Sequence, residues 1–210
     1  MRPRLVVITD TTVAPAPLIA ERIEHVLRMA RPGTVVVQLR DRELPVRERM
    51  ALGERLTAAV RRHEQWIVVN DRLDLALLLG ADGVHLGEGS VDTADARAVL
   101  GARAWVSRAC HDAERLASLD SDAVLLSPIA ADRKGRPALG ASGIERARAV
   151  IDGMDTLRRP LLYALGGIDA SNMATWMAAG ADGVAVIGAA LDGRDAEPLV
   201  TALRIQRVEP

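Results

Sequence analysis

Eight short apolar runs, separated by longer amphipathic segments, dominate the sequence. They are rich in Val, Ile and Leu and lack strict alternation, which is typical of parallel strands covered on both faces. Eight strand-then-helix units predict a (β/α)8 TIM barrel forming one domain over residues 1–210. A doubly wound open sheet is the alternative, but it seldom needs eight consecutive units. The expected strands are 5–9, 34–40, 66–70, 83–87, 104–109, 123–129, 161–167 and 183–189.

Helical periodicity fills the segments between the runs. Apolar residues such as Ile19 and Ile23 recur every three to four positions, and the Pro32-Gly33 pair should end that first helix. The same pattern predicts a second helix over residues 46–62.

Turn chemistry supports the same order of elements. Asp112 and Asp169 stand where helix N-caps are expected, just after the fifth and seventh strands. The pentapeptide GADGV occurs at 80–84 and again at 180–184, each time between a helix and a strand. Its first glycine should cap the preceding helix, so both copies indicate the same local geometry.

Composition excludes several classes of protein. The 27 basic and 28 acidic side chains nearly cancel, and only three Trp and one Tyr are present, which argues against a nucleic-acid surface. No apolar run is long enough to span a bilayer, and the basic N-terminus runs directly into the first strand, so we expect a cytoplasmic location. The single cysteine, Cys110, is expected to be a small buried hydrophobe.

Glycines at the ends of the last two strands indicate a phosphate site. Gly166 and Gly167 follow the seventh strand, and the eighth ends in Ile187-Gly188. Without a Cβ, backbone amides can approach a phosphate closely, and barrels often bind phosphate at this place. The loop 130–141 resembles a basic lid over an anionic substrate. Its basic residues are Arg133, Lys134 and Arg136.

Polar residues follow the second and third strands as well. Arg40, with Arg42 and Lys134, could form a cationic clamp around a second anionic group. Asn70 could bind a phosphate oxygen, and Asp71 a divalent metal. Asp71 has another interpretation, since it could instead cap the helix that begins LDLALLL.

Two histidines are the best acid/base candidates, because only His titrates near neutral pH without tuning. His111 lies just past the fifth strand, at the expected active-site end, and ranks first. His85 lies within a strand and could be a catalytic group or a hydrogen-bonded core residue. His25 and His63 are expected on the surface of helices.

These motifs together resemble the thiamine-phosphate synthase/TenI family over essentially the whole chain. The matching pieces, besides the histidine after the fifth strand, are QLRDRE (38–43), NDRLDLALLLGADGVHLG (70–87), ALGGI (164–168) and AGADGVAVIGAAL (179–191). The resemblance implies a (β/α)8 barrel. It also implies one of two activities, which the family divides between its branches. Synthases join a pyrimidine diphosphate to a thiazole phosphate and release pyrophosphate with Mg²⁺, whereas TenI proteins isomerise the thiazole phosphate carboxylate without metal.

Carried over residue by residue, the synthase pattern assigns diphosphate and metal binding to Gln38, Arg40, Asn70, Asp71 and Lys134. Arg42 stands in place of the usual Lys. The departures point towards the TenI branch, because Ser90 replaces the second magnesium-binding Asp and the loop before Lys134 is short. Two serines of the synthase pattern are also replaced, by Ala109 and Gly188.

Three functions follow, and we expect the first. In a thiazole tautomerase without cofactor, His111 would move a proton while the amides around Gly167 and Gly188 hold the phosphate. The alternative is a synthase in which Asp71 holds Mg²⁺, with Glu88 as a candidate to stand in for the missing second Asp. A non-catalytic barrel that binds a phosphorylated metabolite or regulates a partner is the third. A homodimer is possible in each case.

Overall fold

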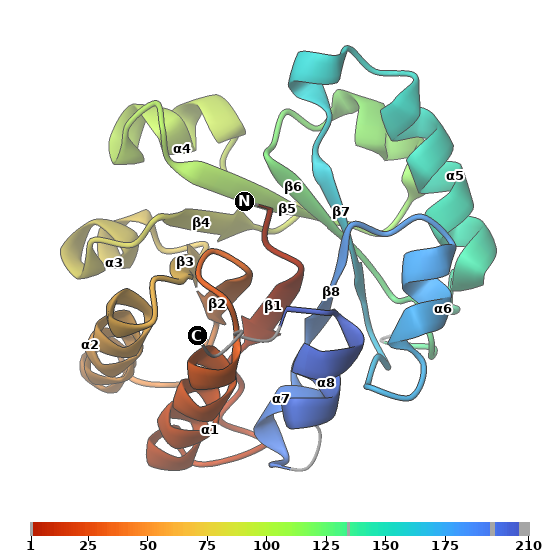
Figure 1. Cartoon of the computed structure of the whole chain (residues 1–210). Helices are drawn as coiled ribbons and strands as arrows, with labels where there is room; N and C mark the ends of the chain where they lie inside the picture. Colours follow the sequence, from red (N-terminus) through yellow and green to blue (C-terminus); the bar gives the residue numbers. More distant parts are fainter. Residues whose placement is uncertain (1, 134, 194–195, 206–210) are drawn as a thin grey trace.

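The computed structural model of the chain describes residues 2–133, 135–193 and 196–205 (Figure 1). Eight parallel strands close into a barrel in which each strand pairs with the next and β8 pairs with β1. All eight predicted strands are present, so the (β/α)8 prediction is confirmed. The strands are β1 (Leu5–Ile8), β2 (Val35–Leu39), β3 (Trp66–Asn70), β4 (Gly83–Leu86), β5 (Trp105–Cys110), β6 (Ala123–Leu126), β7 (Leu161–Leu165) and β8 (Gly183–Val186).

Helices surround the barrel on its outside, as Figure 1 shows. They are α1 (Ala16–Met29), α2 (Val46–Arg62), α3 (Leu73–Leu79), α4 (Thr93–Leu100), α5 (Gly140–Asp152), α6 (Met173–Ala178), α7 (Gly188–Leu191) and α8 (Ala196–Ala202). The segments after β5 and before β7 form 3₁₀ helices, η1 (Ala113–Ser118) and η2 (Thr156–Arg158). The α2 bounds match the prediction, and α1 ends before Pro32-Gly33 as expected.

Two layers of apolar side chains hold the fold together. The larger layer lies between the strands and the helices, and burial of such side chains is the main stabilising contribution to a domain of this kind. The smaller layer fills the barrel interior with residues from alternate strand positions, as the two-residue period of a strand requires. Its members are Val6, Ile8, Val36, Val68, Trp105, Ala123, Leu125, Leu161, Tyr163 and Ala185.

The predicted helix caps are only partly confirmed. Asp112 is the N-cap of η1, where its side chain accepts a hydrogen bond from the Glu114 amide, 3.0 Å away. Asp169 instead forms a turn before α6, whose N-cap is Asn172, because its carboxylate accepts from the amide of Ser171. Gly80 caps α3 in the left-handed conformation, as expected.

One arrangement repeats at the start of three even-numbered strands. In each case an aspartate just before the strand accepts two kinds of hydrogen bond. One comes from a backbone amide of the preceding strand. The other comes from an arginine on the helix that lies before that preceding strand in the chain. Both GADGV copies have this arrangement of hydrogen bonds. The third example of the arrangement occurs without that sequence. The sets are Asp82 with Ile67 and Arg61, Asp122 with Val106 and Arg97, and Asp182 with Leu162 and Arg148.

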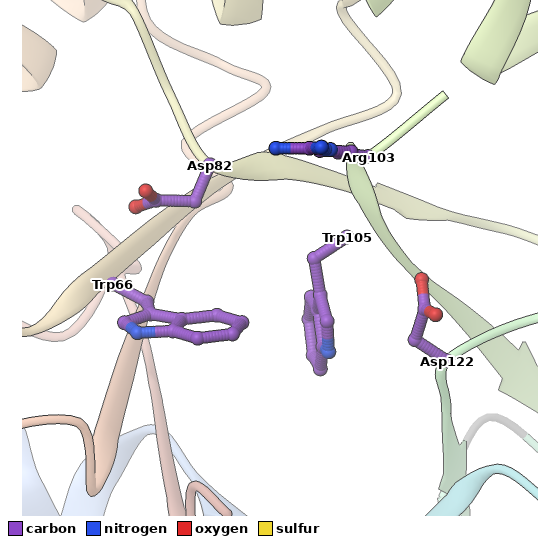
Figure 2. Close-up of a pocket in the computed structure, with 5 residues that line it drawn as sticks. All are labelled: Trp66, Asp82, Arg103, Trp105 and Asp122. Atoms are coloured by element: carbon purple, nitrogen blue, oxygen red, sulfur yellow. The ribbon is translucent and has the colours of Figure 1, made fainter. Parts of the chain in front are cut away.

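A cavity of about 200 Å³ lies where β3 and β5 begin (Figure 2). Trp66 and Trp105 meet there edge to face, with ring centroids 6.3 Å apart. Asp82, Arg103 and Asp122 complete its lining. Active sites of this fold lie at the opposite end of the barrel, where the strands finish. The cavity is therefore at the end away from the expected active site.

No helix in the described part of the chain is long and apolar enough to cross a membrane.

Candidate active site

A polar layer crosses the barrel interior near the ends of β2 to β5. Nε2 of Gln38 donates a hydrogen bond to Oδ1 of Asn70 over 3.0 Å, and both side chains are buried. Beside them, Nδ1 of His85 lies 2.9 Å from the hydroxyl of Ser107. Among the described residues, Oε1 of Gln38 has no hydrogen-bond partner. A buried acceptor without a partner is costly, so this atom is available to a ligand donor.

Asp71 is the centre of the polar contacts at the end of β3. Its backbone adopts a left-handed φ of 60°, which is uncommon for a residue other than glycine. That conformation turns the carboxylate towards the loop after β4, where Oδ1 accepts from the Gly87 amide (3.2 Å) and from the hydroxyl of Ser90. Oδ2 accepts from Nδ2 of Asn70 and Nη2 of Arg42, each at 2.7 Å.

These contacts decide between the two interpretations of Asp71. The N-cap of α3 is Arg72, without a side-chain cap, so the capping interpretation is wrong. Burial alone raises the pKa of Asp71, but the hydrogen bonds from Ser90 and Gly87 and the charge of Arg42 lower that pKa below its ordinary value. The carboxylate is therefore ionised and faces the site.

The donor set fits a magnesium ion only with help from the substrate. Within the described residues no group of three or more His, Cys, Asp or Glu side chains could hold a metal. Mg²⁺, however, is commonly held by one or two carboxylates together with substrate phosphates. Asp71 supplies one carboxylate and Ser90 a neutral oxygen beside it. Glu88 instead faces arginines, at 3.4 Å from Arg136 and 3.9 Å from Arg115.

The two arginines after β2 are each paired with a carboxylate. Nη1 of Arg40 lies 3.1 Å from Oδ2 of Asp10, and Nη2 of Arg42 lies 2.7 Å from Oδ2 of Asp71. The guanidinium groups thus stand at the ends of β1 to β3, where an anionic ligand can compete for them. The third member of the expected clamp, Lys134, lies outside the described residues.

The described residues of the loop 130–141 make hydrogen bonds within the loop and to the loop after β4. Arg133 and Arg136 exchange two backbone hydrogen bonds of 2.9 and 3.0 Å, and Ala138 donates to Asp132. The side chain of Arg136 reaches Glu88 in the loop after β4. A basic segment therefore spans from β6 to β4, as a lid would.

His111 is held in one orientation by the chain after β6. Its Nδ1 lies 2.7 Å from the carbonyl oxygen of Ser127, which can only accept, so Nδ1 carries the proton of the neutral ring. Nε2 is then the basic nitrogen, and the half-buried ring can exchange a proton through it.

The other histidines differ in burial. His85 is buried, and burial lowers its pKa to about 4, so it is neutral near pH 7. His25 is exposed, as expected. His63 is less exposed than the surface position that we expected, because its side chain is only 12% exposed and its Nε2 lies 2.7 Å from a carboxylate oxygen of Glu24. Cys110 is buried, as expected.

The glycines after β7 and β8 differ from each other. Gly166 and Gly167 have φ values of 105° and 70°, and a Cβ on Gly167 would meet the side chain of Ala131 at 3.1 Å. Gly188 begins α7 after its N-cap, Ile187, and a Cβ there would meet nothing within 4 Å. Positive φ values and close neighbours thus favour glycine at Gly166 and Gly167, whereas Gly188 faces open space in which a ligand could lie.

Sequence reasoning missed two buried charged residues that support the site. Asp41 accepts from the amide of Thr11 over 2.6 Å and also from the hydroxyl of Thr9. Arg49 donates to backbone carbonyls of the loop after β2. One signal was available for Arg49, since it lies three residues before Leu52 on the apolar face of the predicted helix.

Comparison with known proteins identifies the family. Residues 5–190 match the family described as thiamine monophosphate synthase. A thiamine-phosphate synthase of Thermus thermophilus is 36% identical over 187 residues, covering 87% of each chain. One from Gloeobacter violaceus is 35% identical over 87% of this chain, which spans only 52% of that relative's length.

Solved structures agree with this assignment. Thiamine phosphate pyrophosphorylase from Pyrococcus furiosus superimposes with a TM-score of 0.73 and 25% identity, covering 96% of this chain and 93% of that one. The names of the relatives favour the synthase alternative over the tautomerase that we expected first. The chain belongs to the thiamine monophosphate synthase family.

Proposed function

We propose that the protein is a thiamine-phosphate synthase, which joins a pyrimidine diphosphate to a thiazole phosphate and releases pyrophosphate. The observation that carries the proposal is the presence of two candidate anion sites at the ends of different strands. Arg40 and Arg42 follow β2, whereas the glycines follow β7 and β8. In the closed barrel β8 and β2 are the two neighbours of β1, so the two sites lie on either side of the end of β1. Two separate anion sites suit two phosphorylated substrates.

The residues at the end of β2 and β3 would bind the diphosphate. Arg40 and Arg42 would exchange their carboxylate partners for its oxygens, forming the charge-assisted bonds that guanidinium groups make best. Gln38 and Asn70, already bonded to each other, would orient it. Asp71 and Ser90 would hold a magnesium ion, which neutralises negative charge on the departing pyrophosphate.

The end of β8 would bind the thiazole phosphate. The space above Gly188 leaves room for a phosphate close to the backbone at the start of α7. The basic turn of Arg133 and Arg136 would cover both substrates and exclude water. Lys134 is kept as a diphosphate ligand in this proposal, on the family resemblance alone.

A thiazole tautomerase remains a second candidate, because one observation favours it. Nδ1 of His111 is fixed by Ser127, which leaves Nε2 free to move a proton on a bound ring. This reaction would use no metal and would not need the arginines after β2.

A single set of assays separates the candidates. The purified protein is given the pyrimidine diphosphate, the thiazole phosphate and Mg²⁺, and pyrophosphate release is measured. In parallel, thiazole phosphate carboxylate is supplied without metal, and its isomerisation is followed. Metal-dependent pyrophosphate release that Asp71→Asn abolishes supports the synthase. Isomerisation without pyrophosphate release contradicts the synthase. If the protein shows neither activity, the non-catalytic alternative is the one that is left.

The location and oligomeric state are further proposals. We infer a cytoplasmic homodimer, in line with a biosynthetic role of the kind that the relatives' names describe. Light scattering of the purified chain tests the dimer, and cell fractionation tests the location.

A further inference from the structure

Arg49 is a buried arginine that contacts the chain and not a carboxylate. It lies in the first turn of α2 and is 7% exposed. Nη2 donates to the carbonyl oxygens of Arg42 (2.5 Å) and Leu44 (3.3 Å). Among the described residues it forms no ion pair, and its buried Nε has no hydrogen-bond partner. Burying a charge without a direct ion pair is costly, so the position of Arg49 calls for an explanation.

The segment that Arg49 holds is the loop between β2 and α2. This loop carries Arg40 and Arg42, the two arginines at the candidate diphosphate site. Its first residues are tied to β1, because Asp41 accepts from Thr11 and the Arg40 amide donates to the hydroxyl of Thr9 over 2.9 Å. Its later residues are tied by Arg49, so the loop is fixed at both ends.

A fixed loop matters because Arg42 is otherwise exposed. Its side chain is 55% exposed and makes one ion pair, with Asp71. A long exposed side chain loses rotamer freedom when it binds a ligand, and a rigid backbone beneath it reduces that cost. Arg49 donates to the backbone carbonyl of Arg42 itself. This hydrogen bond therefore fixes the backbone from which the Arg42 side chain extends.

We propose that Arg49 is a positioning residue that holds the loop of Arg40 and Arg42 in the shape that binds diphosphate, an inference that rests on the proposed synthase function. A buried cation is also poorly screened by salt, so Arg49 adds positive potential beneath the loop. Burial and the charges of Arg72 and Arg42 lower its pKa, with Asp41 opposing, but a guanidinium stays protonated.

The test measures binding of inorganic pyrophosphate and of thiazole phosphate to the whole chain by calorimetry, with Mg²⁺ present. Arg49→Met removes the donor and the charge but keeps the stem. Arg49→Lys keeps the charge with a shorter reach. Arg47→Met is the matched control, because Arg47 is exposed on the same helix.

We expect Arg49→Met to weaken pyrophosphate binding about tenfold or more and Arg49→Lys about threefold, with thiazole phosphate binding unchanged. A merely structural role would weaken both ligands together. Equal pyrophosphate affinity in Arg49→Met and Arg47→Met overturns the inference. If Arg49→Met does not fold, parent-like affinity of Arg49→Lys overturns it instead. A parent chain that binds no pyrophosphate refutes the proposed diphosphate site, which is a separate failure.

Discussion

The hydroxyl of Ser90 donates a hydrogen bond to Oδ1 of Asp71, joining the loop after β4 to the end of β3. A neutral donor thus lies where a second carboxylate would complete a two-carboxylate magnesium site. The pair places the ionised carboxylate of Asp71 beside a residue that adds no charge.

Ser90→Asp is therefore expected to tighten magnesium binding. A second carboxylate adds charge and another oxygen ligand, so the Mg²⁺ concentration for half-maximal pyrophosphate release should fall about tenfold. Titration with Mn²⁺, followed by electron paramagnetic resonance, measures the metal directly. Ser90→Ala serves as the control, since it removes the hydrogen bond without adding a ligand. An Mn²⁺ affinity equal to that of the parent would show that this position does not face the metal.

Glycine-to-alanine changes should separate packing from ligand binding. At Gly188 a Cβ meets nothing, so Gly188→Ala should change the free energy of unfolding by less than about 0.5 kcal/mol. Its methyl group should weaken thiazole phosphate binding about tenfold, because it occupies the phosphate space. Gly167→Ala should instead destabilise the fold by about 1–2 kcal/mol, since its φ of 70° is unfavourable with a Cβ. Chemical denaturation and calorimetry give both numbers. Unchanged phosphate affinity in Gly188→Ala would remove this glycine from the site.

Any tautomerase activity should depend on His111. Its Nδ1 is committed to Ser127, so Nε2 is the nitrogen that can move a proton. Replacing it in His111→Gln should lower the isomerisation rate about 10²–10⁴-fold, with little change in KM. His25→Gln is a suitable control because His25 is exposed on α1. Isomerisation at the parent rate in His111→Gln would rule out this histidine as the proton carrier.

The buried His85 should make stability depend on pH. Its folded pKa of about 4 is below the ordinary value of 6.5, so the unfolded chain takes up the proton first as pH falls. The contribution of neutral His85 to the free energy of unfolding is fully present above pH 6.5. It is lost as the pH falls from 6.5 to about 4, where the free energy of unfolding changes by up to about 1.4 kcal/mol per pH unit. Urea unfolding at several pH values checks this. The slope in that window should be smaller in His85→Gln than in the parent, and an equal slope would contradict the assignment.

The strand order and the barrel were predictable because their signals are local. The pattern that predicts each element is contained in one short segment. Examples are the apolar run of β3 and the amphipathic spacing of α2. The candidate site was harder. His111 could be ranked above His85 by its place after a strand, but its partner Ser127 comes from another strand end.

The sequence alone determined the number and order of the strands and which residues reach the active-site end of the barrel, because burial on both faces demands apolar runs and turns favour particular residues. Only the tertiary structure decided what those residues touch. Asp71 could be expected to cap α3 until the structure showed that its left-handed backbone turns it towards Ser90, nineteen positions away. The hydrogen bond from Arg49 to the carbonyl of Arg42 likewise depends on how the loop after β2 leads into α2. Such contacts follow from the relative placement of elements in the closed barrel, which no short segment of sequence encodes.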